Sequence, residues 1–265
     1  MIHPHTYIHP NAKLATNVKV DPFSVIHSNV EISEGTWIGS NVTIMEGARI
    51  GKNCRIFPGA VISAIPQDLK YEGETTTVEI GDNTTIREFV TINRGSKEKW
   101  KTKVGSNCLI MAYSHIAHDC EVGDYCIMSN NTQMAGHVVM GDHSILAGMC
   151  AIHQFVKIGQ HAFIAGGSLV SKDVPPYIKA GRTPLSYACV NSVGLMRRGF
   201  TVNRINQILD VYRIIYNRGL NTTQALHYIE EELSATDERD EIVTFIQESG
   251  RGIIKKYGKG SIDEE

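Results

Sequence analysis

Polar residues at a regular spacing could assemble a catalytic site in this chain. His118, Gly136 and Gln154 are 18 positions apart, and so are Asp119 and His137. A neutral imidazole can take a proton near pH 7 and later return it, and a neighbouring carboxylate can fix its tautomer. A glycine backbone N–H can closely approach an oxyanion. These residue types suit acyl transfer to a hydroxyl, provided that the fold places positions 18 apart side by side.

A six-residue repeat supplies that placement. Counting every sixth position from Ile2 to Val170, 26 of 29 residues are aliphatic, and the exceptions are Asp68, Glu74 and Glu98. Four positions after each of these, 27 of 29 residues are Ala, Cys, Ser, Thr or Val. A helix needs an apolar period near 3.6 and a simple strand needs 2, so neither explains six. The pattern predicts short strands joined at corners, with one bulky and one small side chain pointing inward on each side.

Three such sides make a triangular coil of 18 residues that buries its interior only by stacking on its neighbours, with a rise of about 5 Å per coil. The prediction is that one column on one face contains the hexads that begin at Ile62, Ile80, Glu98, Ile116, Met134 and Ile152. His153 and Gln154 then lie in the uppermost hexad of the site, and the loop at 95–103 leaves the column below His118. Five of the six cysteines fall in the small inward register and are expected to be inert core thiols, namely Cys54, Cys108, Cys120, Cys126 and Cys150. His143 and His161 stack on a different face and are expected to be solvated.

Two polar segments, 65–77 and 95–103, interrupt the repeat without changing its frame, and they predict surface loops. The repeat stops after 174–181. Thr201 is a candidate cap of a helix that ends at Gly219, and Asn221 is a candidate cap of a second helix that contains Leu226, Ile229 and Leu233. A third helix, which stops at Gly250, contains Ile242, Phe245 and Ile246. We expect domains at 1–182 and 183–265, the second covering the open end of the coil.

The composition limits which binding partners and which cellular compartment we expect for this protein. A net charge of −2 gives no reason to expect nucleic acid. The first ten residues do not resemble a signal peptide, and no apolar run reaches about 18 residues, so no stable membrane insertion is expected. Six cysteines without a C-x-x-C pair favour free thiols in a reducing compartment, which predicts a cytoplasmic protein.

Several strings resemble the UDP-N-acetylglucosamine O-acyltransferase family of lipid A biosynthesis: QDLKYEGE (67–74), VEIGDNTTIREFVTINRG (78–95), HIAHDCEVGD (115–124), AGHV (135–138), IHQFVKIG (152–159), DVPPY (173–177) and LMRRGF (195–200). The resemblance implies a mainly β fold, a left-handed parallel β-helix of hexapeptide repeats with a C-terminal α-helical domain, assembled as a homotrimer. It implies transfer of an (R)-3-hydroxyacyl chain from acyl carrier protein to the sugar 3-hydroxyl, without a metal or a cofactor of its own beyond the phosphopantetheine of the carrier.

The resemblance also implies roles for individual residues. His118 is the general base, Asp119 orients it, and Gly136 donates to the oxyanion. The residues implied to hold the substrates, in a cleft between subunits, are Asp68, Lys70, His115, His137, His153, Gln154, Gly166, Asn191, Arg197 and Arg198. Gly166 matches a position where bulk shortens the acyl channel, so glycine implies a long chain. The basic residues Arg251, Lys255, Lys256 and Lys259 could attract an acidic carrier protein or be merely solvated.

Two departures from the family pattern and three rival functions stay open. Asn93 stands where many relatives have histidine, and Val193 stands where some have an acid. One rival is the related N-acyltransferase that acts on an O-acylated UDP-glucosamine. A second is a zinc carbonic anhydrase with His115, His118 and another subunit's histidine as ligands. A third is a non-catalytic scaffold. The strings QDLKY, HIAHDC and RRGF in this order favour O-acyl transfer.

Overall fold

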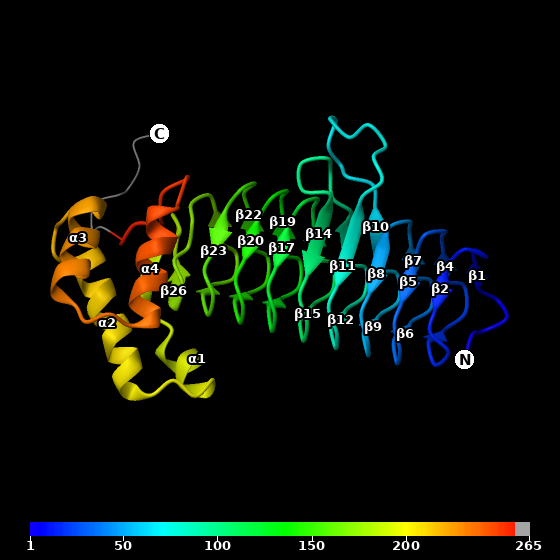
Figure 1. The fold of residues 1–265 in the computed structure, drawn as a ribbon, viewed down its shortest axis with the longest axis horizontal. Coiled ribbons are helices and arrows are strands. Elements are labelled where there is room, and N and C mark those ends of the chain that lie inside the picture. The colour runs from blue at the N-terminus through cyan, green and yellow to red at the C-terminus, as the bar shows by residue number, and fades with distance from the viewer. Residues whose placement is uncertain (258–265) are drawn as a thin grey trace.

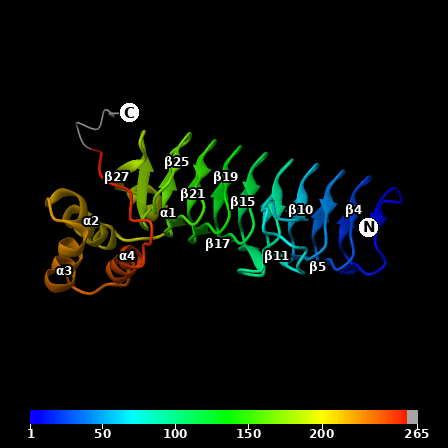
Figure 2. The ribbon, with the colours of Figure 1, turned by 90° about the horizontal axis from the view of Figure 1, so that it is seen from above.

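The computed structural model describes residues 1–257 and shows a left-handed parallel β-helix that is closed at one end by helices (Figure 1). Its strands form three sheets, one on each side of a triangular coil. We name the sheet that carries the predicted site residues the site sheet. The other two are named by their outward side chains, the charged sheet and the apolar sheet. The helices lie at the end of the coil opposite to the N-terminus (Figure 2).

The site sheet consists, in order, of β1 (Tyr7–Ile8), β4 (Val25–Ile26), β7 (Thr43–Ile44), β10 (Val61–Ala64), β13 (Thr91–Asn93), β16 (His115–Ile116), β19 (Gln133–Met134), β22 (Ala151–Ile152) and β25 (Leu169–Val170). The charged sheet consists of β2 (Lys13–Leu14), β5 (Glu31–Ile32), β8 (Ala48–Ile50), β11 (Thr77–Ile80), β14 (Lys101–Val104), β17 (Glu121–Val122), β20 (Val139–Met140) and β23 (Lys157–Ile158). The apolar sheet consists of β3 (Lys19–Val20), β6 (Trp37–Ile38), β9 (Arg55–Ile56), β12 (Thr85–Ile86), β15 (Leu109–Ile110), β18 (Ile127–Met128), β21 (Ile145–Leu146), β24 (Phe163–Ile164), β26 (Ile178–Gly181) and β27 (Ser186–Val190).

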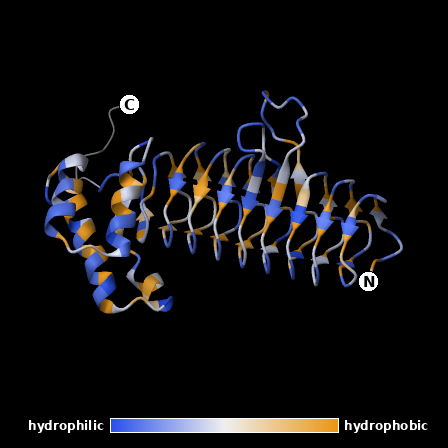
Figure 3. Cartoon of the chain, viewed as in Figure 1, coloured by the Kyte–Doolittle hydropathy of each residue, from blue (hydrophilic) through white to orange (hydrophobic). Residues whose placement is uncertain are grey.

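The two inward registers fill the interior of the coil, as predicted. From Val18 to Val174 the bulky and small residues of the regular coils are buried. The five cysteines of the small register are buried free thiols, which confirms that prediction, whereas Cys189 is exposed. The corners are mostly turned by residues with positive φ, which side chains rarely adopt outside such turns. In Figure 3 the turns and the two protruding loops are mainly hydrophilic or neutral.

The predicted column was wrong for two of its six hexads. Ile62 is followed in the site sheet by Ile92 and then by Ile116. Ile80 belongs to the charged sheet, where it pairs with β8 and β14. Glu98 lies in the loop between β13 and β14, which we call the second loop; the first loop lies between β10 and β11. The reason is that each loop replaces whole hexads: two extra hexads separate β10 from β11, and one separates β13 from β14. Both loops leave the coil at the corner between the site and charged sheets (Figure 1).

The helical end comprises α1 (Ser192–Arg197), α2 (Val202–Asn217), α3 (Thr222–Glu232) and α4 (Asp237–Gln247). Thr201 and Asn221 cap α2 and α3 as predicted, accepting hydrogen bonds from the backbone N–H groups of Arg204 and Gln224. The antiparallel hairpin β26–β27 and the short helix α1 were not predicted, and β27 extends the apolar sheet beyond residue 182. Within residues 1–257, no helix combines the length and apolarity needed to cross a membrane.

The prediction of a solvated His161 was wrong. Its ring is buried between His143 and Tyr177, with centroid distances of 4.7 Å and 5.6 Å, and Phe200 packs against its edge. Burial lowers the pKa of His161 to about 4. His143 is partly buried in the same stack. Tyr125, Tyr177 and Phe200 cover the two stacked rings along this corner.

Candidate active site

His118 and Asp119 form a hydrogen-bonded pair at the corner that follows β16. Nδ1 of His118 lies 2.8 Å from Oδ2 of Asp119, and the carboxylate is fully buried. Asp119 has a φ of 61°, and its backbone N–H donates to the Thr102 hydroxyl at 2.8 Å. A carboxylate on Nδ1 holds the proton there, which leaves Nε2 as the free, basic nitrogen.

The second loop supplies two further donors to Asp119. The backbone N–H of Ser96 donates to Oδ1 at 2.9 Å, and its hydroxyl donates to Oδ2 at 2.6 Å. Burial alone would raise the pKa of Asp119, but the hydrogen bonds from Ser96 and His118 outweigh it, and the pKa is lowered. Sequence reasoning missed Ser96, because serine at that position matches the small inward register.

Gly136 and His137 lie one coil above this pair, as the 18-residue spacing predicts. A Cβ built on Gly136 would lie 2.7 Å from both Cε1 and Nε2 of His118, so a side chain there would collide with the ring. No acceptor within residues 1–257 receives the Gly136 N–H. Nε2 of His137 lies 3.7 Å from Asp119 and 3.4 Å from Glu98, and burial lowers its pKa. The site therefore offers a basic nitrogen beside a free backbone donor.

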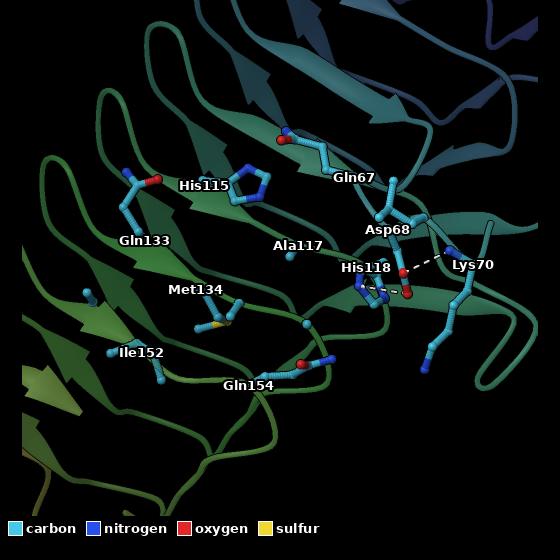
Figure 4. Close-up of a pocket in the computed structure, with 14 residues that line it drawn as sticks. Gln67, Asp68, Lys70, His115, Ala117, His118, Gln133, Met134, Ile152 and Gln154 are labelled. Carbon is cyan, nitrogen blue, oxygen red and sulfur yellow. Dashed lines mark hydrogen bonds and ion pairs between the residues drawn. The ribbon is translucent and has the colours of Figure 1, made fainter. Parts of the chain in front are cut away.

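The first loop brings Asp68 and Lys70 over His118. Oδ2 of Asp68 lies 3.8 Å from Nε2 of His118, and Oδ1 accepts the backbone N–H of Lys70 at 3.0 Å (Figure 4). These groups border a cavity of about 810 Å³. Its walls are formed by Gln67, Asp68, Leu69, Lys70, His115, Ala117, His118, Gln133, Met134, Ala135, Gly136, Ala151, Ile152 and Gln154. Charged groups therefore meet an apolar strip of the site sheet.

The other predicted site residues on the site sheet differ in exposure. Nδ1 of His115 lies 2.7 Å from the Thr91 hydroxyl, and burial lowers the pKa of His115. Gln154 lines the cavity, but its neighbour His153 is exposed and does not. Asn93 is buried and donates from Nδ2 to the Ile65 carbonyl at 3.0 Å, so it fastens the base of the first loop.

Four predicted residues lie away from this cavity in the single chain. Asn191 is buried and donates to the His161 carbonyl at 3.0 Å, and Arg198 donates to the His143 carbonyl at the same distance. Arg197 ends the same helix, α1, on which Val193 is exposed. These groups occupy the corner between the charged and apolar sheets. Gly166 lies at the third corner, where a Cβ would come within 3.0 Å of the Gly148 carbonyl.

One group of potential metal ligands occurs in residues 1–257, and it is the site itself. Ligand atoms of His118, Asp119 and His137 lie within 4.8 Å of one another. The Asp119 oxygens, however, already accept the hydrogen bonds from Ser96 and His118. A metal bound to Asp119 would have to displace donors that position the imidazole.

Comparisons with known proteins identify relatives that cover the whole chain. Residues 173–254 match the family model described as UDP N-acetylglucosamine O-acyltransferase, domain 2, and residues 29–64 and 101–136 match bacterial transferase hexapeptide repeats. The acyl-[acyl-carrier-protein]–UDP-N-acetylglucosamine O-acyltransferase of a Sulfurihydrogenibium species is 55% identical over 100% of this chain and 99% of its own length. The enzyme of the same name from Chlorobaculum parvum is 54% identical over 97% of this chain and 98% of its own.

Solved structures show the same relationship. A UDP-N-acetylglucosamine acyltransferase from Bacteroides fragilis is 49% identical, covers 96% of this chain and 100% of its own, and superposes with a TM-score of 0.93. The acyltransferase from Francisella novicida is 41% identical, covers 100% of this chain and 97% of its own, and gives 0.95. Identity of this extent, over the coil and the helical end alike, shows that the chain belongs to the UDP-N-acetylglucosamine O-acyltransferase family and is an acyltransferase.

Proposed function

We propose that this protein transfers an (R)-3-hydroxyacyl chain from acyl carrier protein to the 3-hydroxyl of UDP-N-acetylglucosamine, the first step of lipid A biosynthesis. The observation that carries the proposal is the arrangement of Nε2 of His118 beside the unpaired N–H of Gly136. An acyl transfer needs a base at the nucleophile and a donor at the developing oxyanion. Both lie at the wall of a cavity large enough for a sugar nucleotide and a pantetheine thioester.

In the proposed mechanism, Nε2 of His118 takes the proton of the sugar hydroxyl as its oxygen attacks the thioester carbonyl. Asp119 stabilises the imidazolium through Nδ1, and the Gly136 N–H donates to the carbonyl oxygen as it becomes an oxyanion. Collapse of the intermediate re-forms the carbonyl and breaks the C–S bond. The imidazolium returns its proton to the pantetheine thiolate, so the free carrier thiol and the acylated sugar leave. The donor brings its own phosphopantetheine, and the chain needs no further cofactor or metal.

The charges around the cavity support substrate binding there. Lys70 offers a cation to the diphosphate, while Asp68, His115 and Gln154 offer hydrogen-bonding groups to the sugar. His137 lies beside Asp119 and Glu98, and His153, which does not line the cavity, is exposed next to Gln154. The apolar strip formed by Ala135, Ala151 and Ile152 gives a surface for the acyl chain.

A homotrimer would bring the remaining residues into the site. The charged sheet has alternating ion pairs on its outside, such as Lys13 with Glu31, whereas the apolar sheet presents Leu109, Ile127, Ile145 and Phe163. At the corner between the apolar and site sheets, four large apolar side chains are more than half exposed: Phe23, Phe89, Tyr113 and Met149. Single monomers rarely expose contiguous apolar surface of this kind. Packing the site sheet against the apolar sheet of the next copy would cover it.

In that packing, the edge of the site sheet at its corner with the charged sheet lies beside the edge of the neighbouring copy's apolar sheet at its corner with the charged sheet. The first edge carries His118, and the second carries α1. Asn191, Arg197 and Arg198 of a neighbouring copy would therefore face the cavity and contact the sugar nucleotide. Gly166, at the corner between the apolar and site sheets, would leave room for a long acyl chain between two copies.

The carrier protein would dock near the helical end. A second cavity, of about 710 Å³, is lined by Lys172, Arg182, Lys255 and Lys256 beside Leu185 and Tyr257. Its Leu169 pairs with Ala151 of the first cavity, so the two adjoin along the site sheet. Such a basic surface suits an acidic partner. Arg251 lies nearby, and Lys259 lies outside the described residues. Free buried thiols suit the cytoplasm, where we place the protein.

The test is product analysis with the purified protein and a mixture of 3-hydroxyacyl carrier proteins. We expect mass spectrometry to find 3-O-acylated UDP-N-acetylglucosamine, and no product from the acceptor that lacks the 3-hydroxyl. Acylation only of a free 2-amine would contradict the proposal, and so would zinc-dependent CO₂ hydration without acyl transfer. His118→Ala should lower kcat by about 10²–10⁴-fold. The control His227→Ala, on the exposed face of α3, should leave it unchanged.

A further inference from the structure

Ser96 contacts the carboxylate that orients the proposed base. Its hydroxyl donates to Oδ2 of Asp119 at 2.6 Å, and the same oxygen accepts Nδ1–H of His118 at 2.8 Å. Its backbone N–H donates to Oδ1 at 2.9 Å. The serine, the carboxylate and the imidazole therefore form one continuous chain of hydrogen bonds that leads to Nε2 at the cavity.

Burial strengthens these hydrogen bonds. Asp119 is fully buried and Ser96 is 7% exposed, so water has little access to replace a missing donor. Hydrogen bonds to a charged group in such surroundings are stronger than those between neutral partners. The carboxylate cannot easily turn, because Ser96 holds both of its oxygens.

We propose that Ser96 is a positioning residue for the acyl transfer, which orients the Asp119 carboxylate and, through it, the His118 imidazole. This inference rests on the proposed function of the same site. It also explains why the chain leaves the coil after β13: the extra hexad places Ser96 against a carboxylate that belongs to the next coil.

Ser96 also sets how strongly Asp119 attracts the imidazolium. Two donors share Oδ2, so the oxygen has less charge to offer to Nδ1–H of His118 than it would have with one. Removing the hydroxyl should strengthen the attraction and so favour the imidazolium over the neutral ring. The other charged or ionisable groups near the two rings are Asp68 over Nε2 of His118, Glu98 and Lys99 beside His137, and His115 on β16, the strand that His118 follows. Asp68, Glu98 and Lys99 lie on the two loops, and Ser96→Thr, which keeps the hydroxyl, controls for any change in their positions.

A purely structural role is the competing explanation. The Ser96 hydroxyl also accepts the backbone N–H of Glu98 at 3.3 Å, so it helps to shape the loop. A serine that only shaped the loop would change stability or the overall rate. It would not move the pH at which the base loses its activity.

The experiment measures kcat/KM against pH for the wild type, Ser96→Ala and Ser96→Thr. For Ser96→Ala we expect kcat/KM on the plateau to fall roughly 10-fold. We expect the midpoint of the acidic limb to rise by about half a pH unit. Ser96→Thr keeps the hydroxyl and should restore the wild-type midpoint. The matched control is Lys101→Ala, which removes an exposed ion pair with Glu79 just after the same loop and should change neither quantity.

A second measurement does not depend on activity. NMR spectra of the His118 ring, recorded without substrates over the same pH range, should show the imidazolium persisting to higher pH in Ser96→Ala than in the wild type. If that variant does not fold, Ser96→Cys, whose thiol is a weak donor, should show it instead. An unchanged midpoint of the acidic limb and an unchanged pH dependence of the ring signals would overturn the positioning role, even if kcat falls. Failure of the wild type to acylate UDP-N-acetylglucosamine would refute the proposed function, while the NMR result would still decide the role of Ser96.

Discussion

Replacing Gly136 by alanine should impair catalysis through the position of one ring. The added Cβ would lie 2.7 Å from Cε1 and Nε2 of His118, whereas ordinary contact begins at 3.4 Å, so the ring must move by about 0.7 Å. That movement strains the 2.8 Å bond to Asp119 and carries Nε2 away from the acceptor hydroxyl. Misplacement of a reacting group by about 1 Å can cost about 100-fold in rate. We therefore expect kcat to fall by roughly 100-fold.

Alanine keeps the backbone N–H, so the oxyanion donor remains and the variant isolates the effect on the base. Gly136 does not have the positive φ that would itself strain an alanine. The overpacking should lower the free energy of unfolding by about 1–3 kcal/mol. The control is Gly250→Ala, where a Cβ meets nothing within 4 Å. The assay is steady-state kinetics together with thermal unfolding. A Gly136→Ala enzyme with a kcat close to that of the wild type would refute the reasoning.

Two further predictions concern buried groups outside the cavity. Because burial lowers the pKa of His161 from 6.5 to about 4, the unfolded chain binds a proton between these pH values that the folded chain does not. The free energy of unfolding should therefore decrease as the pH falls from about 6.5 towards 4, and denaturant titrations of His161→Phe should show a shallower decrease. The six cysteines differ in access, so a thiol reagent should alkylate Cys189 alone in the folded protein, and all six after denaturation, as counted by intact mass.

Much of the fold could be predicted from the sequence, because a coil of this kind depends on local rules. Each inward side chain contacts its own coil and the coils on either side, so the requirement for one bulky and one small residue recurs in every hexad. The helix caps at Thr201 and Asn221 are equally local, since each involves a residue three positions ahead. The hairpin β26–β27 and helix α1 gave no periodic signal. The positions of the hairpin and of α1 are determined by packing against the last coil.

The identity of the face on which each hexad lies could not be predicted. A loop made of whole hexads keeps the period of six while the chain leaves the coil, so Ile80 and Glu98 matched the pattern of a column to which they do not belong. The loops before β11 and β14 together replace three hexads, which is one full coil. Ile116 therefore returned to the column that was predicted from Ile62. The predicted clustering of Asp119, Gly136 and His137 around His118 is present, although the predicted route through the loops was wrong.

The same property explains why Ser96 was missed. In the pattern it is one more small residue four positions after an expected bulky one, and nothing local distinguishes a core serine from one that binds a carboxylate. Its partner, Asp119, is 23 positions away, a spacing that no regular coil produces. Contacts at irregular spacing arise only where a loop leaves the coil. In a repetitive fold, polar residues inside frame-preserving loops are therefore the ones to test first for a role at the nearest site.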